Sequence, residues 1–124
     1  MAMGIVFDET SGKVIAAAIE VHKQLGPGFL ESIYEQALMI EFGKRGIRYS
    51  RQHEIEVMYD DQPVGKHRLD FLVESEIVLE LKTVKDIIDE HFVFVRSYLK
   101  AVEKKHGLII NFAKPTLEVK RVIR

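Results

Sequence analysis

Apolar residues recur at helical spacing in two stretches near the start of the chain. The first stretch predicts a helix over residues 11–25, with Thr10 or Ser11 as the N-cap and the glycine after it as the stop. A Gly-Pro-Gly break follows, and the second stretch predicts a helix from Leu30 to Gly43. We therefore expect two consecutive helices joined by a tight turn.

The pattern changes to alternation after the second helix. Apolar side chains occupy every second position over residues 55–59, which predicts a strand, and a turn follows at residues 60–63. Two further strands are predicted over residues 64–73 and 77–82. The three residues between them form a link short enough for a hairpin.

The last third of the chain reads as helix and then strand. Residues 86–105 have the length and the apolar stripe of a helix, and Gly107 leads into a strand over residues 108–112. Strand, helix and strand in this order predict a parallel crossover. Residues 117–123 suit a last edge strand, although Pro115 and the basic residues around it also fit a frayed tail.

The length of 124 residues predicts a single domain over 1–124, with 1–10 and 114–124 as candidates for frayed ends. There are no cysteines, which excludes disulfides, thiolate metal sites and cysteine nucleophiles. Any metal must then bind oxygen or imidazole. The first ten residues contain neither a basic leader nor a long apolar run, so we expect no membrane span and a cytoplasmic location.

The hairpin turn at Glu74-Ser75-Glu76 allows the register to be tested. If the turn is centred on Ser75, residues whose numbers sum to 150 face each other across the two strands. One side is then apolar throughout, and a slip of one residue would destroy the match. The facing apolar pairs are Leu69 with Leu81, Phe71 with Leu79, and Val73 with Ile77.

The same register places Asp70 opposite Glu80 on the other side, with Lys82 two residues along. Directly opposed like charges are destabilising, and a divalent cation would relieve the repulsion. Mg²⁺ binds one or two carboxylates together with water and phosphate oxygens, and a nearby lysine can polarise the phosphate. The three side chains match that specification. A solvated sheet face, with lysine and arginine neutralising the acids, remains the alternative.

Apolar Leu72 and Val78 lie on the same side as the two acids, which suggests that something covers this face. We expect the second helix to be the cover. Its Glu31 would then add a third carboxylate, although an acid at a helix start is more often a surface residue that compensates the helix dipole.

Two motifs resemble a known family. Residues 28–34, Gly-Phe-Leu-Glu-Ser-Ile-Tyr, read GxxExxY, and Asp70 followed by Glu80-Leu81-Lys82 reads D…ExK. Together they resemble the GxxExxY proteins of the PD-(D/E)XK nuclease-like superfamily. The resemblance extends from about Ser11 to Phe112 and includes the segments 19–22, 98–100 and 110–112.

The resemblance implies an α/β fold with a restriction-endonuclease-like core, in which a mixed β-sheet is flanked by helices. It also implies a phosphodiesterase site that uses Mg²⁺ or Mn²⁺ and acts on nucleic acid, DNA or RNA. Asp70 and Glu80 would be metal ligands, Lys82 would face the phosphate, and Glu31 would assist metal binding. Tyr34 and Tyr98 are candidate substrate-binding residues; Tyr34 could alternatively orient Glu31, or be a core tyrosine.

One position departs from the family pattern. Related proteins often have a glutamine four residues before the tyrosine of the third helix, where this chain has Phe94 before Tyr98. Phenylalanine offers no hydrogen bond, so the site would be weakened, altered or completed by another residue such as His91. The apolar run Phe92–Val95 also predicts deep burial or a homodimer contact.

The local basic residues leave two functions open. The net charge is only −1, so binding to nucleic acid would need a local basic patch. Two clusters exist, namely Lys44, Arg45, Arg48 and Arg51, and Lys100, Lys104, Lys105 and His106. The first hypothesis is a metal-dependent nuclease. The alternative is a catalytically weak or inactive module with the same fold that binds nucleic acid or protein.

Overall fold

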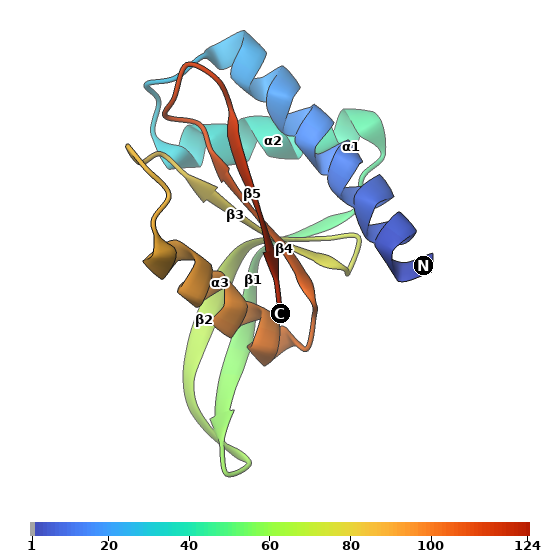
Figure 1. Ribbon diagram of the computed structural model, residues 1–124, viewed down its shortest axis with the longest axis vertical. Helices are drawn as coiled ribbons and strands as arrows, with labels where there is room; N and C mark the ends of the chain where they lie inside the picture. The colour runs from blue at the N-terminus through green and yellow to red at the C-terminus, as the bar shows by residue number, and fades with distance from the viewer. Residues whose placement is uncertain (1) are drawn as a thin grey trace.

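The computed structural model describes the backbone of residues 2–124 and the side chains from Glu9 onward (Figure 1). Two helices are followed by three strands, a third helix and two more strands. The elements are α1 (Ala2–Leu25), α2 (Glu31–Arg45), β1 (Tyr49–Tyr59), β2 (Gln62–Val73), β3 (Ile77–Lys82), α3 (Asp89–Val102), β4 (His106–Asn111) and β5 (Glu118–Ile123).

The five strands form one mixed sheet in the order β1-β2-β3-β4-β5. Only β3 and β4 are parallel, and α3 is the crossover between them, as the sequence predicted. The predicted hairpin register is confirmed for Phe71 with Leu79, Leu72 with Val78, and Val73 with Ile77. The last strand, β5, pairs with β4 along its whole length, so this segment is an edge strand rather than a frayed tail.

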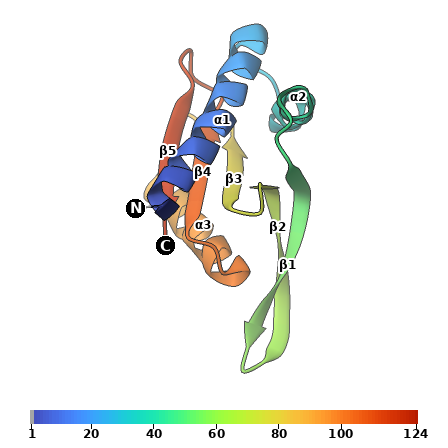
Figure 2. The same ribbon diagram turned by 90° about the vertical axis from the view of Figure 1, so that its right-hand side faces the viewer.

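Helices cover both faces of the sheet (Figure 2). One core lies between the sheet and helices α1 and α2, and the other lies between the sheet and α3. Leu72 and Val78 belong to the second core. The expectation that the second helix covers them is therefore wrong, because the crossover places α3 on that face. None of the helices described for residues 2–124 is long and apolar enough to span a bilayer.

The two N-terminal helices differ from the sequence prediction at their ends. Helix α1 begins at Ala2 and runs through the expected cap. Thr10 and Ser11 do not cap a helix, because the Thr10 hydroxyl donates to Glu76 (3.2 Å) and the Ser11 hydroxyl accepts from Arg121 (2.9 Å). Helix α2 continues past Gly43 and ends at Arg45, and the following Gly46, with a φ of 67°, has the left-handed conformation of a helix C-cap.

The β1–β2 hairpin extends as an arm well beyond the rest of the sheet (Figures 1 and 2). Strand β3 pairs only with the last three residues of β2, whereas β1 pairs with β2 along the whole arm. The sheet therefore forks at Asp70. The predicted pairing of Leu69 with Leu81 does not form, because Leu69 packs in the α3 core and Leu81 in the core of α1 and α2.

Candidate functional site

The fork between β2 and β3 holds Asp70 and Glu80 together. The strand ladder ends at Phe71 and Leu79, and side chains take over beyond it. The Asp70 N–H donates to Glu80 Oε1 (3.2 Å), and the Leu81 N–H donates to Asp70 Oδ2 (2.8 Å). Side-chain carboxyl groups thus supply the hydrogen bonds between β2 and β3 just beyond the end of the ladder. The structure brings these two predicted site residues together.

A kink in β1 lies beside Asp70. Gln52 stands opposite Asp70 in the β1–β2 register but forms no ladder pair, and its backbone has a left-handed φ of 50°. Buried Glu35 on α2 accepts from Arg51 Nε (2.6 Å) and from Gln52 Nε2 (3.1 and 3.0 Å to its two oxygens). Neighbours in a regular strand point to opposite faces, so the left-handed backbone is what lets both side chains reach one carboxylate.

Sequence reasoning missed both Glu35 and Gln52. A glutamate on a helix and a glutamine on a strand are ordinary residues, and nothing in their spacing marks a contact. A left-handed glutamine costs on the order of 1 kcal/mol, and such strain persists where the surrounding contacts hold it. Glu35 supplies those contacts here.

Burial dominates the electrostatics of the acidic pair. Only 7% of Glu80 is exposed, and burial, followed by the charge of Asp70, raises the pKa of its carboxyl to about 8. Burial also raises the pKa of Asp70, against the opposing effect of the Leu81 N–H bond. Positive charge placed at the fork would therefore be strongly stabilised.

Glu31 and Lys82 lie within electrostatic reach of the pair. Burial raises the pKa of Glu31, the charge of Asp70 raises it further, and Lys82 lowers it. Glu31 is the first residue of α2, and Lys82 is the half-buried last residue of β3. Among the described residues, however, no three His, Cys, Asp or Glu side chains are already arranged to hold a metal ion. Glu31 approaches the pair without completing a cluster.

Tyr34 is a core tyrosine. It is fully buried and stacks on Phe112 with ring centroids 4.4 Å apart. Its hydroxyl donates to the Gly26 carbonyl (2.6 Å) and accepts from the Phe29 N–H (3.2 Å). The structure therefore gives Tyr34 the core position that was one of its alternatives, and the hydroxyl holds the turn that precedes α2.

Tyr98 lies near the acidic pair. Burial raises the pKa of its phenol, and the charges of Glu80 and Asp70 raise it further. Its ring packs against His67 at a centroid distance of 4.7 Å. His91 Nδ1 accepts from the Ile88 N–H (3.0 Å), so this nitrogen is used within the start of α3.

The Phe92–Val95 run is divided by the packing of α3. Val95 is buried in the core, whereas 55% of Val93 and 53% of Phe94 is exposed. The exposed pair leaves a homodimer contact as a prediction. Deep burial of the whole run is wrong.

The first basic cluster is paired with acids, and of its members Arg51 is bound to Glu35 at the kink beside Asp70. Lys44 and Arg45 end α2, about 20 Å along the helix from Glu31. Each of the four basic residues of this cluster contacts a carboxylate: Lys44 with Glu41 (3.9 Å), Arg45 with Glu41 (2.7 Å), Arg48 with Glu74 (3.2 Å) and Arg51 with Glu35 (2.6 Å). The second cluster lies at the end of α3 and the start of β4. The fold therefore does not gather the two clusters around the acids.

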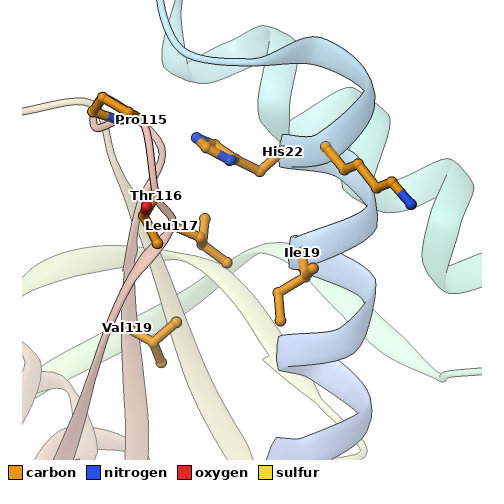
Figure 3. Close-up of a pocket in the computed structure, with 7 residues that line it drawn as sticks. Ile19, His22, Pro115, Thr116, Leu117 and Val119 are labelled. Carbon is orange, nitrogen blue, oxygen red and sulfur yellow. The ribbon is translucent and has the colours of Figure 1, made fainter.

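A separate pocket of about 370 Å³ lies between α1 and the segment that forms β5 (Figure 3). His22 points into the space between them, and its Nε2 lies 2.8 Å from the Lys114 carbonyl. The lining is mostly apolar: Ile19, His22, Lys23, Pro115, Thr116, Leu117 and Val119. The lining does not include Asp70 or Glu80, so this pocket is separate from the fork.

A comparison with protein-family models identifies the family to which the chain is similar. A model described as PD-(D/E)XK nuclease superfamily matches residues 8–122, which is nearly the whole chain. Neither the curated proteins nor the solved structures contain a match. The mixed five-stranded sheet flanked by helices agrees with the fold of that family.

Proposed function

Because the chain belongs to the PD-(D/E)XK nuclease superfamily, we propose that it hydrolyses phosphodiester bonds of nucleic acid with Mg²⁺ or Mn²⁺ held by Asp70 and Glu80. One observation carries this proposal: the buried carboxyl group of Glu80 and the half-buried one of Asp70 share the fork between β2 and β3, joined by the Asp70 N–H bond to Glu80. The family suggests nuclease activity, and the fork supplies the residues.

The side chains at the fork fit such an ion. Mg²⁺ and Mn²⁺ prefer oxygen ligands, and Mg²⁺ is commonly held by one or two carboxylates with the remaining positions filled by water and substrate. The raised pKa of both acids shows that ionising them at the fork is unfavourable, and a bound cation would offset this unfavourable free energy. We propose Glu31 as the third acid, which assists after a side-chain movement toward Asp70. The bound ion would supply Lewis-acid activation of the phosphate and of water.

The chain's own groups have distinct roles in this proposal. The Leu81 N–H fixes Asp70, and the Asp70 N–H fixes Glu80, so neither carboxyl group has to be ordered when substrate arrives. Lys82, two residues beyond Glu80, donates to a phosphate oxygen and stabilises the charge that develops there. Tyr98, on α3, borders the same space and contacts the substrate.

Cleavage assays with purified variants test the proposal. We expect cleavage of DNA or RNA with Mg²⁺ or Mn²⁺, and a loss of about 10²–10³-fold in Lys82→Ala. Glu80→Gln should lose both cleavage and Mn²⁺ binding by calorimetry, whereas Lys82→Ala should keep the binding. Glu56→Gln, an exposed acid on β1, is the matched control and should behave as the wild type. Cleavage at the wild-type rate in both site variants would refute the assignment.

A second candidate is a nucleic-acid or protein-binding module without turnover. Exposed Phe94, at the position where related proteins often have a glutamine, favours it. This module would give no cleavage and no calorimetric heat with Mn²⁺. Heat with Mn²⁺ that disappears in Glu80→Gln favours the nuclease.

We also propose that the chain belongs to the GxxExxY branch of the superfamily and acts in the cytoplasm. Gly28, Glu31 and Tyr34 support the branch, because each has a defined place at the turn before α2. Gly28 adopts a φ of 109°, Glu31 begins the helix, and Tyr34 binds the turn. An alignment in which these three positions vary independently would contradict the branch assignment.

A further inference from the structure

Exposed apolar side chains lie next to the two residues, Glu31 and Tyr98, that approach the acidic pair from different helices. Just before α2, 44% of Phe29 and 72% of Leu30 is exposed, and Glu31 follows directly. On α3, Phe94 lies one helical turn before Tyr98 and on the same flank of the helix. Both helices begin on the side of the molecule where β3 ends (Figure 1). Phe29 therefore lies two residues before Glu31 at the start of one helix, and Phe94 lies one turn from Tyr98 on the other.

Phe29 is held rigidly although much of it is exposed. Its N–H donates to the buried Tyr34 hydroxyl (3.2 Å), and its ring meets the Tyr34 ring edge-on, with centroids 6.2 Å apart and planes at 78°. A fixed exposed aromatic ring loses little conformational entropy when a planar group stacks on it. The Phe29 ring is thus preorganised to stack on a planar group such as a base.

Phe94 has a neighbour of similar exposure that allows a direct comparison. Val93 points to another flank of α3, where it lines a hollow with Arg96, Ser97 and Lys100. Phe94 shares its flank with Tyr98, whose phenol is influenced by Glu80 and Asp70. Of these two exposed apolar residues, Phe94 is therefore the one on the helix flank of Tyr98.

The charge distribution favours single strands over duplex. Duplex binding depends on cations that neutralise many phosphates. At this fork Lys82 is the cation that influences Glu31, Asp70 and Glu80, and the cluster at the end of α2 is paired with acids. Unpaired bases can instead stack on aromatic side chains, which contributes strongly to binding without many cations.

We infer that the substrate is single-stranded nucleic acid, and that Phe29 and Phe94 stack on bases on either side of the phosphate at the fork. This inference rests on the proposed nuclease function and adds the class of substrate. Duplex would have to be unpaired first to reach the same contacts.

Fluorescence anisotropy with full-length Lys82→Ala protein tests the inference without turnover. The probes are labelled oligothymidylate, oligouridylate and a duplex of equal length; the first two distinguish DNA from RNA. We expect single strands to bind at least about tenfold more tightly than duplex. Phe29→Leu and Phe94→Leu should each weaken single-strand binding about 5- to 100-fold, and Phe94→Trp should restore it. Val93→Leu is the matched control and should have no effect.

Equal or tighter binding of duplex, or unchanged affinity in both leucine variants, would overturn the inference. A fall in molar mass of Phe94→Leu by light scattering, with unchanged affinity, would assign Phe94 to a subunit contact and overturn it as well. These failures leave metal-dependent cleavage by the wild type intact. Loss of cleavage with retained stacking would instead reject the nuclease function alone.

Discussion

Replacing Glu80 with glutamine separates the cost of the buried charge from the packing of the side chain. Glutamine has nearly the same shape, and its Oε1 can still accept from the Asp70 N–H, but it cannot ionise. In the metal-free protein the ionised Glu80 is unfavourable, because burial and Asp70 raise its pKa to about 8 from an ordinary value of 4.5. Glu80→Gln should therefore stabilise the metal-free protein at high pH.

The sign and size follow from proton linkage. Between the ordinary pKa and the raised one, the folded state binds a proton more tightly than the unfolded state, so wild-type stability falls as pH rises through this window. The difference from 4.5 to about 8 corresponds to an upper bound of about 5 kcal/mol at ~1.4 kcal/mol per pH unit. Water entering the fork screens the buried charge and lowers this bound. We therefore expect the free energy of unfolding of Glu80→Gln to exceed that of the wild type by about 2–5 kcal/mol at about pH 9 and by little at about pH 4.

Urea unfolding of both proteins in chelator, followed by circular dichroism across this pH range, measures the effect. The free-energy difference should grow with pH, and adding Mg²⁺ should stabilise the wild type at high pH but not the variant. Glu56→Gln should show no such trend, because Glu56 is exposed. Parallel stability curves for Glu80→Gln and wild type, or a wild type that gains stability as pH rises through the window, would refute the reasoning.

Three further substitutions test the packing around the site. Tyr34→Phe removes the hydroxyl that bonds two main-chain groups and should lower the free energy of unfolding by about 1–3 kcal/mol; an unchanged value would deny that role. Gly107→Ala places a Cβ 2.9 Å from Val95 and should cost about 1–3 kcal/mol in urea unfolding, whereas Gly65→Ala, with open space around it, should cost less. Gln52→Val forces a β-branched residue into a left-handed backbone, so we expect a loss of about 1–3 kcal/mol and weaker Mn²⁺ binding by calorimetry; wild-type values for both would show that the kink is unimportant.

The hydrophobic pattern of the sequence determined the order of elements and the local pairing of the hairpin. The change from helical spacing to alternation marks where α2 ends and the strands begin. This boundary can be read from the sequence because apolar residues recur every three or four positions on one face of a helix but every second position on one face of a strand. The register of β2 with β3 was predictable because a slip of one residue would bury the wrong side chains. Asp70 and Glu80 meet as a consequence of this local register.

Tertiary packing decided everything that depends on elements far apart in the chain. The crossover placed α3, not α2, over Leu72 and Val78. Helix α2 nevertheless delivers Glu31 to the acids and buries Tyr34 in the core. The left-handed backbone of Gln52 was invisible in the sequence, because Glu35, on another element, is what holds it. Spacing along a chain encodes which face a side chain takes within its own helix or strand. Which distant element meets that face depends on how all the elements pack together.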